Sequence, residues 1–210
     1  MIRVFLIEPQ ALARAALHKL LDSAPDLRVS GLAADIAGIP RRAGIADVIL
    51  LAARTPLPAM ALARRLRAGQ GSALICILRA GAAALARPLL DCGVRGLVTE
   101  CSPPDEVFAC LHRVHGGHVH LSPDIARRMA LRGGGRPFDA LSAREWQVML
   151  MMARGDSAQT IARALCLSPK TVSTYRCRLL HKLGVRSDLD LLRLALHDGL
   201  LPSGAPHAGT

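Results

Sequence analysis

Hydrophobic residues gather in short runs over the first half of the chain, and stretches of helical periodicity separate the runs. Residues 2–7, 47–51 and 73–78 are nearly continuous apolar segments. Such segments are typical of strands that are buried on both faces of a parallel sheet. Residues 27–30 and 96–98 are weaker and shorter segments of the same kind. The pattern therefore predicts five strands.

Helical patterns fill the intervals between these runs. They cover residues 11–21, a segment through Leu62 and Leu66 that follows a loop at 56–58, and residues 82–91 and 103–115. The expected apolar positions are Leu12, Ala15, Ala16 and Leu20 in the first helix and Val107, Cys110, Leu111 and Val114 in the last. Alternating strands and helices predict an α/β doubly wound parallel sheet, whose sites lie at the carboxyl ends of the strands.

The remaining third of the chain carries only helical patterns. Ser142 and Glu145 have the spacing of a capping box, which starts a helix that buries Trp146, Met149 and Leu150. Ser187 and Asp190 cap a last helix in the same way. The apolar residues of that last helix are Leu189, Leu192, Ala195 and Leu196. A short helix is also predicted at 125–131, ahead of the glycine-rich segment 132–137, which predicts a flexible tether.

The segment 158–183 is the centre of this helical part and predicts two helices with a tight turn. Ile161, Ala162 and Leu165 form one apolar stripe, which breaks at residues 166–167. Ser168 is a good N-cap and Pro169 suits the first helical position. The second helix is expected to bury Val172, Tyr175, Leu179 and Leu183.

Charge turns this pattern into a functional hypothesis. No acidic residue occurs from Ser157 to Ser187. The basic residues of that stretch are Arg163, Lys170, Arg176, Arg178, Lys182 and Arg186. The polar faces of the second helix carry Lys170, Thr171, Ser173, Thr174, Cys177, Arg178 and Lys182, with Arg176 at the border. Cations beside short hydroxyl side chains suit DNA phosphates and base edges. We therefore interpret this helix as one that reads DNA.

Composition agrees with two modest domains and a polyanionic partner. The 210 residues carry 27 basic and 16 acidic side chains, a net charge of +11. Residues 1–136 hold +8 of this charge and residues 137–210 hold +3. The six cysteines include no CxxC pair, which favours reduced thiols. No apolar run approaches the roughly 18–20 residues of a membrane span, so we expect a cytoplasmic protein without a membrane partner.

The motifs FDALSAREWQVMLMMARG (138–155) and CLSPKTVSTYRCRLLHKLGV (166–185) resemble the LuxR-type DNA-binding domain of NarL/FixJ-family response regulators, nearest the GacA/UvrY branch. MIRVFLI, DVILL and CGVRGLVT resemble the CheY-like receiver domain of the same family. The resemblance implies a receiver-like domain at 1–120, a linker at 121–137, a helix-turn-helix domain at 138–201 and a disordered tail at 202–210.

Carried over position by position, the receiver's chemistry is missing from this sequence. The acid pair that holds Mg²⁺ corresponds to Glu8 and Pro9, and the phosphoacceptor aspartate to Ala52. The Thr/Ser, aromatic and lysine positions correspond to Leu78, Leu97 and Glu100. A methyl group offers no nucleophilic oxygen and one carboxylate beside a proline is a poor Mg²⁺ site. We therefore expect a pseudo-receiver without a phosphoacceptor, a cofactor or a metal.

Three alternatives concern this first domain. The apolar residues of the cleft either fill it or line a small-ligand pocket, and filling is favoured. His112, His115, His118 and His120, near Cys110, have a spacing that can ligate Zn²⁺ or Ni²⁺, although late-helix histidines also suit the helix dipole. Cys101 is a weak candidate for a redox thiol beside Glu100.

The resemblance also implies roles in DNA binding. Base edges would be faced by Ser173, Thr174 and Cys177. Phosphates would be held by Lys170, Thr171, Arg176, Arg178 and Lys182. Tyr175 would lie between the core and the DNA backbone. We expect a non-enzymatic, homodimeric transcriptional regulator that acts independently of aspartyl phosphorylation. The alternative is an interaction protein whose pseudo-receiver heterodimerises with an intact response regulator and titrates it. RNA polymerase is a further candidate partner.

Overall fold

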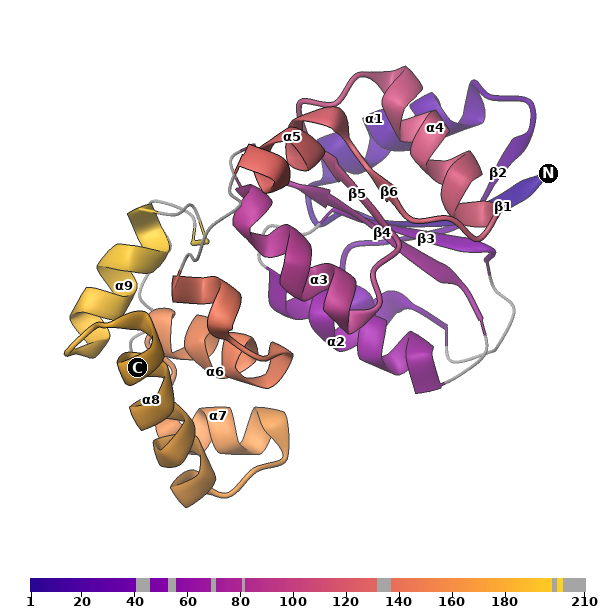
Figure 1. Ribbon diagram of the computed structural model, residues 1–210. Coiled ribbons are helices and arrows are strands. Elements are labelled where there is room, and N and C mark those ends of the chain that lie inside the picture. Colours follow the sequence, from indigo (N-terminus) through magenta and orange to yellow (C-terminus); the bar gives the residue numbers. More distant parts are fainter. Residues whose placement is uncertain are drawn as a thin grey trace. The chain divides into compact units, whose positions relative to one another are not determined.

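The computed structural model describes residues 1–40, 46–52, 56–68, 71–80, 82–131, 137–197 and 200–201 (Figure 1). The chain divides into two compact units, Met1–Ala130 and Leu131–Thr210. The first unit takes in residues 121–130, which the sequence suggested as part of a linker. Each unit is described by itself.

A parallel sheet forms the centre of the first unit. Its strands are β1 (Ile2–Ile7), β2 (Leu27–Ala33), β3 (Val48–Ala52), β4 (Ala73–Leu78), β5 (Gly96–Thr99) and β6 (His120–Leu121). The strand order is β2-β1-β3-β4-β5-β6 and every neighbouring pair is parallel. The predicted doubly wound sheet is therefore confirmed, with one short strand, β6, that the apolar pattern did not predict.

Helices cover both faces of this sheet. They are α1 (Ala11–Asp22), α2 (Pro56–Ala68), α3 (Ala86–Cys92), α4 (Pro104–His115) and α5 (Pro123–Leu131), with short 3₁₀ turns at Ile36–Gly38 and Ala82–Leu85. Helices α1 and α4 lie on one face, and α2 and α3 lie on the other (Figure 1).

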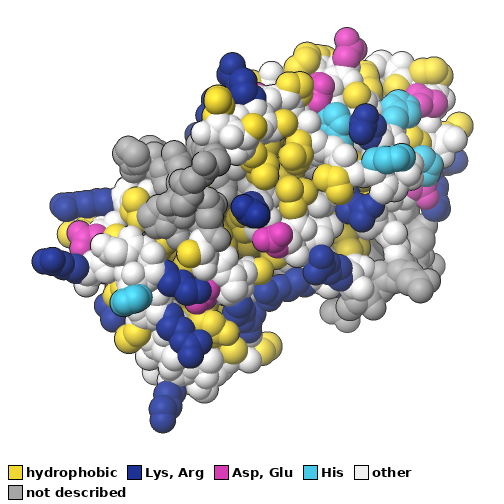
Figure 2. All heavy atoms as spheres, in the orientation of Figure 1, with side chains coloured by type: hydrophobic (Ala, Val, Ile, Leu, Met, Phe, Trp, Pro, Cys, Tyr) yellow, Lys and Arg dark blue, Asp and Glu magenta, His cyan; other side chains and the backbone are white. Residues whose placement is uncertain are grey.

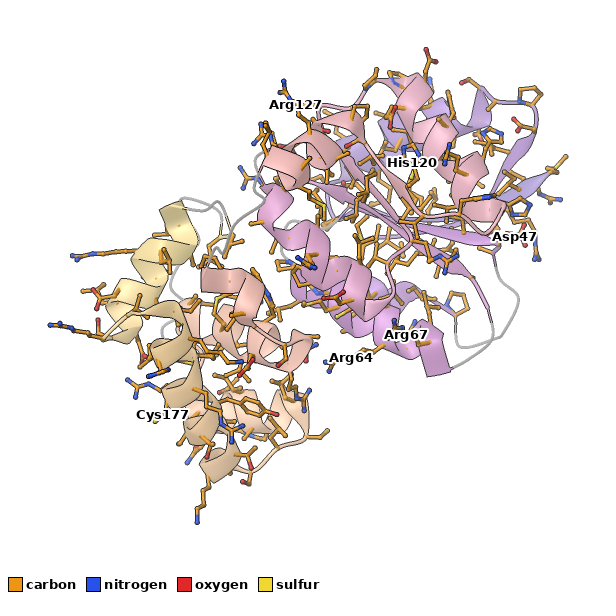
Figure 3. All side chains as sticks on the ribbon, in the orientation of Figure 1. Asp47, Arg64, Arg67, His120, Arg127 and Cys177 are labelled. Carbon is orange, nitrogen blue, oxygen red and sulfur yellow. The ribbon has the colours of Figure 1, made fainter. Side chains whose placement is uncertain are left out.

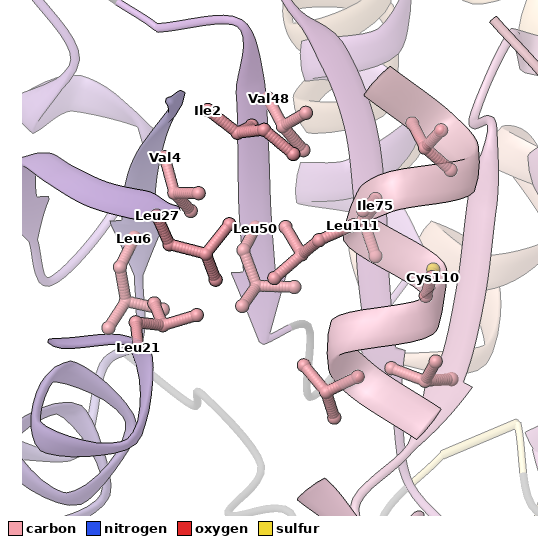
Figure 4. Close-up of a cluster of buried hydrophobic side chains, with 13 residues drawn as sticks. Ile2, Val4, Leu6, Leu21, Leu27, Val48, Leu50, Ile75, Cys110 and Leu111 are labelled. Atoms are coloured by element: carbon pink, nitrogen blue, oxygen red, sulfur yellow. The ribbon is translucent and has the colours of Figure 1, made fainter. Parts of the chain in front are cut away.

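The core beneath α1 and α4 explains why the strands are so apolar (Figure 4). Val4, Leu50 and Ile75 belong to one buried cluster with Cys110 and Leu111 of α4, and all five are at most 1% exposed. The residues that alternate with them along the strands are buried on the opposite face. Burial on both faces follows from a sheet sandwiched between helices.

Two predicted details of this unit are wrong. Leu12 is 85% exposed, whereas Leu21 is 1% exposed and belongs to the core, so the buried side of α1 is not the predicted stripe. Residues 56–58 are not a loop, because α2 begins at Pro56. A proline in the first helical turn loses no hydrogen bond, since the N–H groups of that turn have no intrahelical acceptor.

The described residues of the second unit form helices and no strand. Its elements are a 3₁₀ turn at Pro137–Ala140, α6 (Ala143–Ala153), α7 (Ala158–Leu165), α8 (Pro169–Leu183) and α9 (Asp188–His197). The predicted capping box is present: the Ser142 hydroxyl accepts from the Glu145 N–H, and a Glu145 carboxylate oxygen accepts from the Ser142 N–H at 2.8 Å. The rings of Phe138 and Trp146 pack with centroids 5.4 Å apart.

Helix α9 buries only part of the side that was expected. Ala195 is fully buried as predicted, whereas Leu189 and Leu196 are 56% and 38% exposed and Leu191 is buried instead. Ser187 caps the helix, because its hydroxyl accepts from the Asp190 N–H at 3.1 Å. The predicted start of the helix is thus confirmed, and its predicted apolar face is correct at Ala195 and wrong at Leu189 and Leu196.

Candidate nucleic-acid interface

The start of α8 is set by local chemistry at the turn after α7. Cys166 ends α7 in the left-handed conformation, with φ of 54°, and the Leu167 N–H donates to the Ala162 carbonyl at 2.8 Å. Ser168 then caps α8, its hydroxyl accepting from the Thr171 N–H at 3.0 Å, and Pro169 takes the first helical position. The predicted helix-turn-helix is confirmed.

One side of α8 anchors the helix and leaves the other side free. Val172, Leu179 and Leu183 are at most 5% exposed and pack into the second unit. Tyr175 is only half-buried, so its predicted burial is incomplete. Gly184 ends the helix in the left-handed conformation that glycine adopts without strain.

The exposed side of α8 carries the predicted DNA-reading residues. Lys170, Ser173, Thr174, Cys177 and Arg178 are all exposed, and Figure 3 shows Cys177 directed away from the body of the helix. The Ser173 and Thr174 hydroxyls each donate at 3.1 Å to a helix carbonyl one turn earlier. Both oxygens therefore retain lone pairs on the exposed side, which can accept hydrogen bonds from base amino groups.

The cations of α8 fall into two groups. Arg176 Nε donates to Asp188 Oδ1 at 2.9 Å, and Lys182 Nζ lies 2.8 Å from Glu145 Oε2 and donates to the Ala140 carbonyl at 3.1 Å. Lys170 and Arg178 make no ion pair with any residue that the structure describes. Of the cations on this helix, these two keep their full charge available to a phosphate.

The contact between Lys182 and Glu145 contributes to the stability of the second unit, because it pairs a buried carboxylate with a cation. The Glu145 side chain is 5% exposed, whereas that of Lys182 is 37% exposed. Burial tends to raise the pKa of the Glu145 carboxyl, but hydrogen bonds from Lys182 and Ser142 outweigh it and hold the pKa below its usual value. The sequence resemblance assigned Lys182 to a phosphate. It could not reveal the Glu145 contact, because Glu145 is 37 residues away in the chain.

A second contact that the sequence did not predict joins the start of α6 to the end of α7. The Arg144 guanidinium, next to the capping box, donates to the Leu165 carbonyl at the end of α7 and to Gln147 Oε1 at 3.2 Å. The only available signal was the presence of Arg144 in the motif shared with the LuxR-type domain. This contact fixes α6 against the turn that precedes α8.

The carboxyl edge of the sheet holds three of the positions that the resemblance assigns to a receiver's site. Ala52 is the last residue of β3. Glu8, after β1, is 7% exposed and its Oε1 accepts from the Gln10 N–H at 2.7 Å, so it turns back onto the start of α1. Glu100 lies beyond β5, and its Oε1 is 3.4 Å from the Ala80 N–H.

The apolar cleft residues are packed. Leu78 and Leu97, which end β4 and lie within β5, are 2% and 0% exposed. Burial to this degree is typical of close-packed core side chains. The structure therefore favours filling over a ligand pocket at these two positions.

Two of the four histidines of the predicted cluster, His112 and His120, contact separate carboxylates. His112 Nε2 contacts the Asp26 carboxylate, which raises the pKa of the imidazole, and His120 Nε2 lies 2.6 Å from Glu106 Oε1. Burial raises the pKa of the neighbouring Cys110 thiol to about 12. Within the described residues no three potential ligands gather at one point. Cys101 is exposed, and no described contact bears on a redox role.

A receiver-like α/β unit followed by a helix-turn-helix with unpaired cations defines a class, the two-domain DNA-binding regulators. The family model of bacterial regulatory proteins, luxR family, matches residues 139–195. The response regulator UvrY of Escherichia coli O6:H1 is 31% identical over 209 residues, covering 95% of this chain and 96% of that protein. The transcriptional regulatory protein UhpA of E. coli K12 is 36% identical over 198 residues, covering 92% and 97%.

Solved structures agree with these relatives. RcsB from Salmonella enterica serovar Typhimurium, bound to the promoter rprA, superposes with a TM-score of 0.71 at 21% identity, covering 92% of this chain and 98% of that chain. ChrA, a response regulator of a heme-sensing two-component system, gives a TM-score of 0.53 at 26% identity, covering 95% and 98%. The chain belongs to the NarL family of response regulators, as its motifs indicated. Among the described residues no helix has the length and apolar character needed to cross a membrane.

Proposed function

We propose that this chain is a sequence-specific transcriptional regulator that binds DNA without prior aspartyl phosphorylation. The observation that carries the proposal is the side chain at the end of β3, where Ala52 presents a methyl group. Phosphoryl transfer to a protein needs a nucleophilic oxygen and a cation that neutralises the developing charge. Ala52 supplies no such oxygen, the buried Leu78 and Leu97 supply neither group, and Glu100 places a negative charge where a cation would be needed.

Within this proposal, α8 is the helix that enters the major groove. Lys170 and Arg178 hold phosphates because they keep their charge, and Ser173, Thr174 and Cys177 read base edges. Arg176 and Lys182 hold phosphates only if they leave Asp188 and Glu145. Homodimeric binding to two half-sites about one helical turn apart follows the geometry of helix-turn-helix proteins. The RcsB structures, described as dimers bound to DNA, support this arrangement.

The direct test of phosphorylation independence is incubation of the full chain with acetyl phosphate and Mg²⁺. We expect the intact mass, the oligomeric state and the affinity for DNA to remain unchanged, because Ala52 cannot form an acyl phosphate. Intact-mass spectrometry at neutral pH detects the adduct, and hydroxylamine removes it if it is an acyl phosphate. A hydroxylamine-labile phosphate on the unmodified chain would overturn the proposal.

Variants that restore the missing acidic and basic groups test the same proposal. Ala52→Asp alone is not expected to become labelled, since the new carboxylate meets one acid beside Pro9 and a repelling Glu100. The triple variant Ala52→Asp, Pro9→Asp, Glu100→Lys is the smallest change for which we expect any labelling. Labelling of the single variant at the level of the triple variant would show that the metal site is intact.

Thr174→Ala should change which DNA sequences are preferred rather than how strongly DNA in general is bound. The substitution removes an exposed hydroxyl and no charge, and a lost base contact is worth about 1–3 kcal/mol at one base pair. Selection from a random-sequence pool, compared between the wild type and the variant, measures this. An identical set of selected sequences would exclude Thr174 from base contact.

A further inference from the structure

The receiver-like unit carries a second acid-poor stretch, and it is as basic as the DNA-reading one. From residue 56 to residue 95 the only acidic side chain is Asp91. The basic residues there are Arg64, Arg65, Arg67, Arg79, Arg87 and Arg95. This stretch accounts for much of the +8 that residues 1–136 hold, a charge that the helix-turn-helix does not explain.

Four of these arginines belong to the two helices that cover one face of the sheet. Arg64, Arg65 and Arg67 on α2 and Arg87 on α3 are all exposed, and we call them the α2–α3 basic face. None of the four makes an ion pair with a carboxylate in the part of the chain that the structure describes. Asp91 is one helical turn beyond Arg87 and is exposed, but it does not pair with it.

Contacts between the helices make this a single surface. Arg64 and Arg67 of α2 both lie close enough to the Cys92 thiol at the end of α3 to act on its charge. Arg67 Nε lies 2.6 Å from where a Cβ on Gly93 would be, so the α2 arginine crosses the end of α3 over a glycine. Figure 3 shows Arg64 and Arg67 on the outer side of α2, and Figure 2 shows basic side chains along this part of the surface.

A simpler reading is that Arg64 and Arg67 only complement the negative end of the α3 dipole, which is worth less than about 1 kcal/mol at an exposed site. That reading accounts for two guanidinium groups at the end of α3. It leaves Arg65 and Arg87 without a role, and it does not explain why residues 56–95 contain six arginines and only one acidic residue, Asp91. Unpaired like charges on one surface repel each other, and a polyanion relieves that repulsion.

The guanidinium group favours phosphate as the partner. Its planar fork binds phosphate oxygens through two parallel hydrogen bonds, and all the basic residues of this face are arginine. DNA bound by α8 would supply phosphates close to the first unit. Only residues 132–136 separate α5 from the 3₁₀ turn at Pro137–Ala140, so the connection can span at most about 20 Å. Binding by α8 therefore raises the effective concentration of neighbouring DNA phosphates around the first unit.

We propose that the α2–α3 basic face is a second DNA contact, which binds backbone phosphates outside the segment read by α8. This inference rests on DNA binding by the helix-turn-helix. It assigns to the receiver-like unit a sequence-independent share of the affinity. That share does not depend on phosphoryl chemistry at the carboxyl edge of the sheet.

The test is the salt dependence of DNA binding by the full chain, measured by fluorescence anisotropy on a random-sequence duplex of about 50 base pairs. Replacing Arg64 and Arg67 by Gln should reduce the slope of log K against log salt by about 1.8 per subunit, because each lost phosphate contact removes about 0.9. The matched control is Arg28→Gln with Arg113→Gln. These two exposed arginines lie on β2 and α4, outside α2 and α3, and their removal changes the net charge equally.

Conservative and alternative variants separate charge from folding. Arg64→Lys with Arg67→Lys should restore the slope, since phosphate neutralisation needs only the charge. If loss of the Cys92 contact prevents folding, Arg65→Gln with Arg87→Gln tests the same face without touching that contact. An equal effect of the α2 pair and the control pair would overturn the proposal, because net charge alone would then be responsible. An unchanged slope in folded variants would equally overturn it.

Different results would refute DNA binding by α8 and DNA binding by the α2–α3 basic face. If the wild-type chain does not bind DNA, or if loss of Lys170 and Arg178 leaves binding intact, the proposed function fails first. If those changes weaken binding while the α2–α3 variants match the wild type, only the second contact is refuted.

Discussion

Loss of the two unpaired cations of α8 should weaken DNA binding by about 10- to 100-fold at about 0.1 M salt. The variant is Lys170→Gln with Arg178→Gln. Both side chains are exposed and neither makes an ion pair with a described residue, so their charges are free to displace counterions from DNA. Two lost phosphate contacts flatten the salt dependence by about 1.8 per subunit. The loss should apply to all sequences, because phosphate contacts carry no sequence information.

The measurement is a titration of labelled duplex at several salt concentrations. The Arg28→Gln, Arg113→Gln pair again serves as a control for net charge. Lys170 and Arg178 anchor no other described group, so the thermal stability of the variant should equal that of the wild type. Unchanged affinity at low salt would mean that α8 is not the helix that contacts DNA.

Replacing Lys182 by Met should instead destabilise the second unit, by about 1–2 kcal/mol. The change leaves the buried Glu145 carboxylate without its cation, and the partial exposure of Lys182 keeps the cost below that of a fully buried pair. Trp146 is the only tryptophan and lies buried in α6, so its fluorescence in a urea titration reports on this unit alone.

The pH dependence of this effect has a defined sign. The pKa of Glu145 is lower in the folded chain than its usual value, so the carboxylate stabilises the fold above the usual carboxyl pKa of about 4.3. That contribution disappears as the pH falls through the folded pKa. The difference between the wild type and Lys182→Met should therefore be present at neutral pH and shrink in acid.

Two further variants complete the comparison. Glu145→Gln with Lys182→Met removes both charges and should recover part of the lost stability. Lys170→Met, a matched change at an exposed lysine, should alter the free energy of unfolding by less than about 0.5 kcal/mol. If Lys182→Met and Lys170→Met were equally stable, the Glu145 contact would contribute nothing and Lys182 would be available to DNA.

Local features of this protein could be predicted from the sequence because their causes lie within a few residues. The Ser168 and Ser142 caps accept from N–H groups three positions away, so each motif contains both partners. Strands β1, β3 and β4 show as nearly continuous apolar runs, because burial on both faces leaves few polar positions. The absence of a nucleophile at Ala52 is a property of residue type and needs no fold.

Other features depended on partners that are distant in the sequence. Leu12 and Leu21 both fit a helical stripe, and only packing of α1 against β1 and β2 decided which of them is buried. Strand β6 is two residues long and exists because β5 pairs with it.

The division of the cations on α8 was decided by tertiary structure in the same way. Arg176 and Lys182 look as free in the sequence as Lys170 and Arg178, but Asp188 and Glu145 reach them from neighbouring helices. The basic stretch of the receiver-like unit was visible in the sequence as a count of charges. Only the packing of α2 against α3 brings its arginines onto one surface, where Arg64 and Arg67 lie near the Cys92 thiol and Arg67 crosses Gly93. The physical reason is that side chains on separate helices become neighbours only when the helices pack together.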